Sequence, residues 1–130
     1  MSLLSLRLGT NDLDKARAFY DATFGALGIG PNTAPAGYGI IIYKLSGGIP
    51  FMVGKALDGK PATHANGGTI GFIAPSEEAV TAWHAAGLAN GGSCEGPPGP
   101  RPQAGNKFGA YMRDPDGNKL CAYYGLRIGG

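Results

Sequence analysis

The sequence has few of the residues that form disulfide frameworks or metal sites. It contains two cysteines and two histidines in 130 residues, so neither a disulfide framework nor a Cys/His zinc motif is present. We expect the thiols of Cys94 and Cys121 to be free in a reducing compartment. No apolar run approaches the roughly 18 residues of a membrane helix, and no basic start precedes an apolar leader segment. A cytoplasmic protein without a membrane partner is therefore expected.

Charge is also scarce. Charged residues make up 15% of the chain, the net charge is +2, and the lysines and arginines are scattered. A nucleic-acid-binding face needs clustered basic residues, so no nucleic-acid partner is expected. Glycine and proline are abundant instead, with 24 and 10 residues. None of the glycines forms a phosphate-binding motif between a strand and a helix, and we interpret them as turns and loops.

The chain contains a weak internal repeat. A shift of 64 positions aligns Leu6 with Ile70 and Phe19 with Trp83. Each half then has a short alternating strand, a capping residue, an amphipathic helix and a glycine stop. Only the residue types match, and unrelated strand–helix pairs align to a similar degree. The repeat alone therefore leaves both explanations open.

Periodicity and turn residues predict the elements of each half. The first half is expected to hold a strand over 3–10, a helix over 13–27 capped by Asn11 or Asp12, and strands over 38–45 and 49–54. The second is expected to hold a strand over 69–74, a helix from a Ser76 cap to about 91, and strands over 108–113 and 119–124. The proline-containing segment 93–105 is predicted to be a loop. Sparse helices beside several strands indicate an α+β fold with both helices on one side of the sheet.

Two segments resemble a known family. Segment 6–20 (LRLGTNDLDKARAFY) and segment 113–120 (RDPDGNKL) resemble the first strand–helix unit and the last hairpin of glyoxalase and bleomycin-resistance proteins, the vicinal-oxygen-chelate superfamily. The resemblance implies one domain over 1–130, built of two βαβββ modules over about 1–58 and 66–130. Their sheets would form an open curved barrel with the helices outside. It also implies a homodimer.

Members of this family include glyoxalase I, extradiol dioxygenases and antibiotic-sequestering proteins, and the enzymes hold one divalent metal in the barrel. The resemblance places Ser5, Thr69 and Cys121 where relatives supply histidine or glutamate ligands, and the remaining ligand position falls near Phe51 or Val53. First-row divalent metals require imidazole, carboxylate or thiolate donors. We therefore expect neither a bound metal nor another cofactor.

Alternation along the strands predicts the binding surface. If Leu6 and Leu8 face the helix, Ser5 and Arg7 face the cleft. Arg7 either anchors an anion or forms a structural pair at the rim, and the nearby aromatic residues are either ligand contacts or ordinary sheet residues. His64 is expected in the linker and His84 on the helix surface facing away from the sheet. The candidate ligand-binding residues are Ser5, Arg7, Tyr43, Phe51, Thr69, Tyr111, Cys121 and Tyr123.

These features predict a glyoxalase-like domain that binds a small organic molecule in its cleft without a metal. The alternatives are a lactoylglutathione-lyase-like or dioxygenase-like metalloenzyme with unusual ligands, a metal-independent enzyme, and an interaction module that acts through dimerisation. The identity of the ligand, and whether any reaction occurs, do not follow from the sequence.

Overall fold

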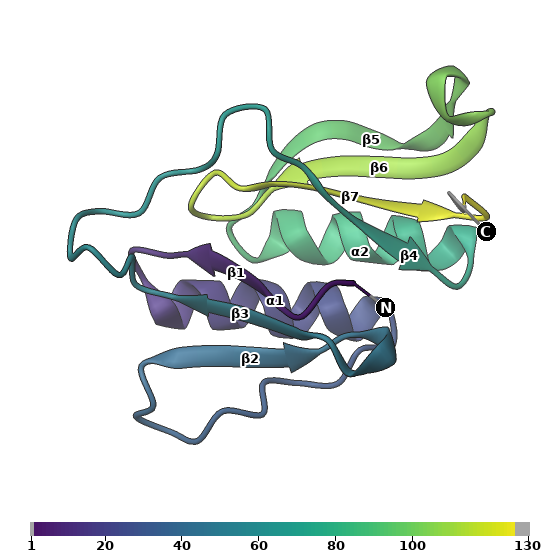
Figure 1. The fold of residues 1–130 in the computed structure, drawn as a ribbon. Helices are drawn as coiled ribbons and strands as arrows, with labels where there is room; N and C mark the ends of the chain where they lie inside the picture. Colours follow the sequence, from purple (N-terminus) through teal and green to yellow (C-terminus); the bar gives the residue numbers. More distant parts are fainter. Residues whose placement is uncertain (1, 127–130) are drawn as a thin grey trace.

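The computed structural model describes residues 2–126, and the outermost positions of the expected domain, 1 and 127–130, lie outside the described residues (Figure 1). Two helices and two sheets give the predicted α+β class. The elements in chain order are β1 (Leu6–Gly9), α1 (Leu13–Ala26), β2 (Ile40–Lys44), β3 (Pro50–Gly54), β4 (Ile70–Ala74), α2 (Glu77–Ala89), β5 (Ser93–Arg101), β6 (Lys107–Arg113) and β7 (Lys119–Tyr124). Within the described part of the chain, no helix has the length and apolar character needed to cross a membrane.

The two halves of the chain repeat one topology. Sheet A has the strand order β1-β3-β2, and sheet B has the order β4-β7-β6-β5. In each sheet the first strand pairs in parallel with the last strand of its half, and the remaining pairs are antiparallel. The two helices lie side by side against the sheets, and the sheets do not close into a barrel over residues 2–126 (Figure 1). This confirms the internal repeat and the open arrangement with helices outside.

Both helices begin where the sequence predicts. The side chain of Asp12 accepts a hydrogen bond from Lys15 N at 3.1 Å, and the side chain of Ser76 accepts one from Ala79 N at 3.0 Å. These bonds satisfy backbone donors that have no partner within the first helical turn. Gly28, just after α1, has a φ of 82°, the left-handed conformation that ends many helices.

The prediction of a loop over 93–105 was wrong, because residues 93–101 form strand β5. This strand contains Pro97, Pro98 and Pro100, which cannot donate backbone hydrogen bonds. Proline is tolerated here because β5 lies at the edge of sheet B and pairs with one neighbour, β6. Two register shifts, between Cys94 and Gly96 and between Gly96 and Gly99, bend the strand.

Sheet A has no partner strand for the outer edge of β2 among the described residues. The segment 30–39 runs beside β2 instead, and Thr33 N donates to Ile42 O at 2.9 Å. The Asn32 side-chain oxygen accepts from Ile42 N at 2.9 Å, replacing a backbone carbonyl in that position. Over the described residues the first module is therefore βαββ, one strand short of the βαβββ module that the resemblance implies, while the second has all four strands.

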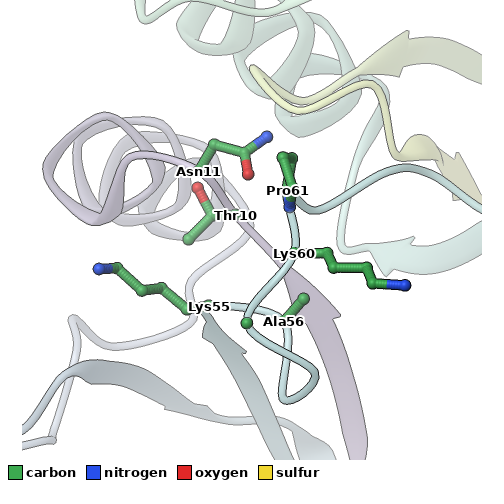
Figure 2. A pocket seen from close by; sticks show the side chains of 7 residues that line it. Thr10, Asn11, Lys55, Ala56, Lys60 and Pro61 are labelled. Carbon is green, nitrogen blue, oxygen red and sulfur yellow. The ribbon is translucent and has the colours of Figure 1, made fainter.

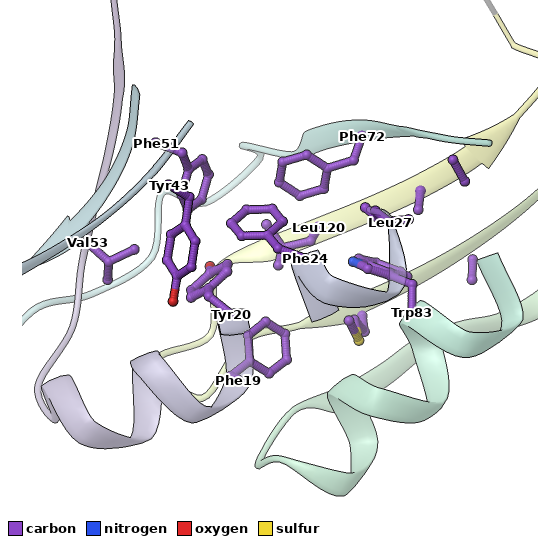
Figure 3. Close-up of a cluster of buried hydrophobic side chains, with 14 of the residues drawn as sticks. Phe19, Tyr20, Phe24, Leu27, Tyr43, Phe51, Val53, Phe72, Trp83 and Leu120 are labelled. Atoms are coloured by element: carbon purple, nitrogen blue, oxygen red, sulfur yellow. The ribbon is translucent and has the colours of Figure 1, made fainter. Parts of the chain in front are cut away.

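The hydrophobic core is continuous between the two modules. Phe24 of α1 packs edge-on against Phe51 of sheet A at a ring-centroid distance of 5.1 Å, and against Phe72 of sheet B at 5.2 Å. Tyr20 and Tyr43 complete this aromatic cluster, and Trp83 is buried in the same core on α2 (Figure 3). Aromatic side chains bury large apolar areas, so this cluster joins the two halves energetically.

A polar network also joins the modules, and it connects the two segments that resemble the family. Buried Asp114, in the β6–β7 turn, accepts from the Tyr20 hydroxyl of α1 at 2.6 Å and from Asn118 Nδ2 at 2.8 Å. The side chain of Asp116 accepts from Asn11 N at 2.9 Å. We call Asn11, Tyr20, Asp114, Asp116 and Asn118 the inter-module network.

Candidate ligand-binding face

Three predicted site residues share the face of sheet B that is turned away from the helices, which we call its open face. Strand register places Tyr111 opposite Cys121, while their neighbours Met112 and Leu120 pair on the helix-facing side and are fully buried. Tyr123 follows Cys121 by two residues and lies on the same side of β7. The hydroxyl oxygens of Tyr111 and Tyr123 are 2.7 Å apart, within hydrogen-bond distance.

Glycines leave space for these side chains. A Cβ added to Gly109, the register partner of Tyr123, would lie 2.5 Å from the Tyr123 ring. A Cβ added to Gly71 would lie 3.2 Å from the sulfur of Cys121. A contact of 2.5 Å is closer than real Cβ atoms approach, and one of 3.2 Å would require Cys121 to shift slightly. Glycine at position 109 therefore makes room for the Tyr123 ring, and Gly71 eases the packing of Cys121.

Two cations flank the Tyr111 ring, and neither was among the predicted site residues. The Lys119 ammonium lies 5.5 Å from the ring centroid, and the Arg101 guanidinium lies 5.7 Å from it. Arg101 is held by hydrogen bonds to the carbonyls of Gly99 and Pro97. Period-2 alternation from Cys121 would have found Lys119, but Arg101 was missed because its strand was interpreted as a loop.

The neutral forms of the polar groups are favoured on this face. Burial raises the pKa of the Cys121 thiol, and the nearby Lys119 charge and the Tyr111 hydroxyl lower it less. Burial and the hydrogen bond with Tyr111 also raise the pKa of Tyr123. The protonated forms of the Cys121 thiol and the Tyr123 hydroxyl therefore lie on a face that also carries two positive charges.

On sheet A, Arg7 lies on the side of β1 away from the core, and Ser5, which precedes β1, is half-buried. Leu6 and Leu8 pack against the core, and Arg7 is exposed. Arg7 Nη2 donates to Lys55 O at 2.9 Å. Arg7 also lines a cavity of about 280 Å³ formed with the inter-module segment 56–63. This cavity and the Tyr111–Tyr123 pair are on different sheets.

The expectation that Tyr43 and Phe51 line the cleft was wrong. They pair across β2 and β3, have no exposed surface, and belong to the aromatic core with Phe24. The Tyr43 hydroxyl donates to Asp21 at 2.7 Å, and burial together with this bond raises the pKa of Tyr43. Both faces of β2 and β3 carry apolar residues, so alternation alone did not show which face is buried.

The remaining predicted residues lie elsewhere. Thr69 is exposed and immediately precedes β4. His64 is exposed in the inter-module segment, as expected, with its ring beside Gly117. The expectation that His84 lies on the helix surface was wrong, because it is 7% exposed and its Nε2 lies 3.2 Å from Cys94 Sγ.

A further cavity, of about 230 Å³, lies where β1 meets α1 and the inter-module segment (Figure 2). It is lined by polar and charged residues, including Thr10, Lys55 and Lys60. The two lysine side chains extend in opposite directions rather than toward one point (Figure 2). This cavity therefore lacks the converging polar groups that are typical of a binding site.

The comparisons with known proteins agree with this architecture. The family model of the Glyoxalase/Bleomycin resistance protein/Dioxygenase superfamily matches residues 2–122. The chain belongs to the glyoxalase/bleomycin resistance protein/dioxygenase superfamily. This confirms the resemblance of the two segments, and the match spans both modules. No curated protein matches the chain.

Solved structures of this superfamily superpose on the chain. A glyoxalase/bleomycin resistance protein from Albidiferax ferrireducens T118 is 45% identical with a TM-score of 0.85, covering 95% of this chain and 98% of its own. A glyoxalase-related enzyme from Fulvimarina pelagi is 20% identical, with a TM-score of 0.77 and coverages of 95% and 88%. A lactoylglutathione lyase from Agrobacterium tumefaciens is 22% identical, with a TM-score of 0.64 and coverages of 95% and 93%. The last two similarities establish the fold alone.

The side chains at the ligand positions implied by the family pattern are weak donors for a divalent metal. Over residues 2–126, no three or more His, Cys, Asp or Glu side chains are grouped so that they could hold a metal ion. Ser5 and Thr69 offer neutral hydroxyls at two positions implied by the family pattern. At the third, burial raises the pKa of Cys121 and opposes the thiolate form that binds metals.

Proposed function

We propose that the open face of sheet B binds a small organic molecule that carries an anionic group, without help from a divalent metal. The observation that supports this most directly is the pair of hydroxyls on Tyr111 and Tyr123, bonded at 2.7 Å beside two cations. Membership of the superfamily fits a binding site on this side of the sheet. It does not identify the ligand.

The chemistry of the face suits a carboxylate or phosphate on an aromatic or apolar scaffold. Lys119 and Arg101 supply positive charge, and the hydroxyls of Tyr111 and Tyr123 supply hydrogen-bonding groups. The tyrosine rings supply apolar surface, as small-molecule sites commonly do. Hydrogen bonds to charged groups contribute about 1.5–3 kcal/mol each, so each cation is expected to change affinity at least tenfold.

Arg7 is the candidate anion contact on sheet A. One of its N–H groups is used by Lys55 O, yet the side chain remains exposed. An arginine fork can bind a carboxylate through two parallel hydrogen bonds. In this proposal Ser5, Arg7 and Thr69 contribute to ligand binding from outside sheet B, whereas Tyr43 and Phe51 support the core.

The proposed loss of the metal site rests on the side chains at the implied ligand positions. Hydroxyl groups are weak neutral donors, and a thiol with a raised pKa is a poor ligand at neutral pH. Binding in this chain would therefore depend on shape, hydrogen bonds and charge. A metalloenzyme with unusual ligands is the alternative outcome of the test below.

The test measures thermal unfolding of chelator-treated protein with a panel of aromatic carboxylates, phosphate monoesters and their neutral amide or alcohol analogues. Ligands that bind the native state raise the melting temperature. We expect shifts with the anionic compounds and smaller shifts with the neutral ones. Lys119→Ala and Arg101→Ala should each weaken binding at least about tenfold.

Lys15→Ala is the matched control, because it removes the same charge from an exposed position on α1. An equal loss in this variant would show that only the net charge matters, and would contradict the proposed face. A shift that requires added metal and disappears on chelation would favour a metalloenzyme. A panel of anions with no effect on the wild type would reject the ligand class.

We also propose that the protein forms a homodimer. Large apolar side chains are exposed near the sheets, including Leu4 at 85% and Ile73 at 62%. Ile73 lies on edge strand β4, and edge strands are normally covered or charged. Light scattering during gel filtration measures the mass directly. A monomer at tens of micromolar would contradict this proposal without affecting the ligand proposal.

A further inference from the structure

Two side chains that the proposed ligand-binding face does not use lie in contact on the other side of sheet B. His84 of α2 and Cys94 of β5 approach with Nε2 and Sγ 3.2 Å apart. His84 is 7% exposed, whereas Cys94 is exposed. The imidazole is thus held by packing, and it contacts the sulfur of a residue at the protein surface.

The fold brings these residues together through a tight turn after α2. Gly91 has a φ of 92°, which favours glycine, and a Cβ added to Gly92 would lie 2.7 Å from the Phe19 ring and 2.9 Å from Arg113 O. The chain therefore reverses over two glycines and returns as β5 along α2. Cys94 pairs with Met112, whose side chain faces the helices, so the thiol also faces α2.

We propose that Cys94 and His84 form a reactive thiol–imidazole pair that undergoes reversible mixed-disulfide formation with low-molecular-weight disulfides. Nε2 of His84 accepts the Cys94 proton, and Sγ attacks one sulfur of the disulfide. The new S–S bond joins Cys94 to that half, and the original S–S bond breaks. The other half leaves as a thiolate and takes up a proton, so Cys94 is oxidised and the leaving half is reduced.

The surroundings keep His84 in the form that this step needs. Burial lowers the pKa of His84, and the positive charge of Arg101 lowers it further. The imidazole is therefore neutral at neutral pH, and a neutral Nε2 without a proton can act as a base. The charged side chain next to Cys94 in sequence is Glu95, and it is paired with Arg113.

Cys121 provides an internal reference in the same chain. It is 8% exposed, it lies on the open face of sheet B, and burial raises its pKa. A buried thiol with a raised pKa reacts slowly, because the thiolate is the nucleophile. If exposure and the imidazole determine reactivity, Cys94 should react and Cys121 should not.

The experiment treats folded protein with bis(2-hydroxyethyl) disulfide, quenches with acid and follows intact mass over time. The wild type and Cys121→Ser should each gain one hydroxyethylthio group, which dithiothreitol removes, and Cys94→Ser should gain none over the same period. His84→Gln should slow the reaction of Cys94 about tenfold or more at neutral pH. His64→Gln, which changes an exposed histidine of the inter-module segment, should leave the rate unchanged.

A pH series separates base assistance from simple exposure. Because the pKa of His84 is lowered, the His84-dependent part of the rate should persist to a lower pH than an ordinary histidine allows, and should disappear on further acidification. If His84→Gln does not fold, native Cys121→Ser is compared with the same protein unfolded in urea. The proposal is overturned if native Cys94 reacts no faster than the unfolded thiol, if His84→Gln retains the full rate, or if Cys121 takes the group first.

Discussion

In the first module the open face of sheet A carries Ile42 and Met52 beside Arg7, whereas in the second module the open face of sheet B carries hydroxyl, thiol and cationic groups. The helix-facing sides are alike, because both modules bury apolar side chains against their helices. The two modules thus resemble each other where their sheets pack against the helices. They differ on the open faces of the sheets, which do not contact the helices.

This contrast assigns different tasks to the two halves. The first module supplies most of the aromatic core, through Tyr20, Phe24, Tyr43 and Phe51. The second supplies the polar face and the turn that carries Asp114. If the halves depend on one another in this way, changes in the first should affect the stability of the whole chain. Changes on the open face of the second should affect binding with little loss of stability.

Phe24→Ala should have the largest effect on stability. Phe24 contacts Phe51 and Phe72, one in each sheet, and it has no exposed surface. Truncating a buried phenylalanine costs about 3–5 kcal/mol, and we expect about 4 kcal/mol here. Urea unfolding followed by tryptophan fluorescence and circular dichroism measures this loss.

Tyr38→Ala is the control for this variant. Tyr38 is 64% exposed, so its removal should change the free energy of unfolding by less than about 0.5 kcal/mol. We expect both probes to report one shared transition in the wild type. Two separate transitions, or a cost below about 1 kcal/mol for Phe24→Ala, would show that the modules do not share a core.

Asp114→Ala should have the next largest effect. The change removes the buried carboxylate that accepts hydrogen bonds from the Tyr20 hydroxyl and from the backbone N–H groups of Asp116 and Asn118. An unsatisfied buried polar group costs about 1–3 kcal/mol, and some of these donors can turn to water. We expect a loss of about 3 kcal/mol in the free energy of unfolding.

Asp58→Ala provides the comparison for the inter-module network. Asp58 is exposed and accepts a local hydrogen bond from Lys60 N, so its loss should cost about 0.5 kcal/mol. Equal effects of the two changes in urea unfolding would mean that the inter-module network adds nothing beyond a surface turn.

The turn around Asp114 shows how far sequence reasoning extends. The composition of residues 114–118 predicts a hairpin turn, and the structure has β6 and β7 on either side of it. The bond from Asp114 to Tyr20 spans 94 positions, and no local pattern reports contacts of that range. Local rules therefore identified the turn and left its partner unknown.

The errors have similar physical causes. Alternation predicted that Arg7 lies on the side of β1 opposite Leu6 and Leu8, and that Tyr123 shares a face of β7 with Cys121, and the strands have both arrangements. It failed for Tyr43, because its strand is apolar on both faces and either could have been buried. The loop prediction for β5 failed because proline was taken to exclude a strand, although an edge position tolerates it.

The smallest predicted effects compare one glycine in each helix. Gly25 of α1 is exposed, and a Cβ added there would meet no atom within 4 Å. Gly87 of α2 is buried, and an added Cβ would overlap the end of the Met112 side chain and lie 3.2 Å from the Phe19 ring. Gly25→Ala should therefore stabilise the protein by about 0.5 kcal/mol, because alanine favours the helix.

Gly87→Ala has the same helix preference but must displace Met112, which has no exposed surface. Overpacking a core costs about 1–3 kcal/mol, which exceeds the gain of about 1 kcal/mol from replacing glycine in a helix. We therefore expect a net loss of about 1 kcal/mol, opposite in sign to Gly25→Ala, in the same urea titration. If both changes stabilise the protein, Met112 can move without cost. That result would show that α2 is not tightly packed against sheet B around Gly87.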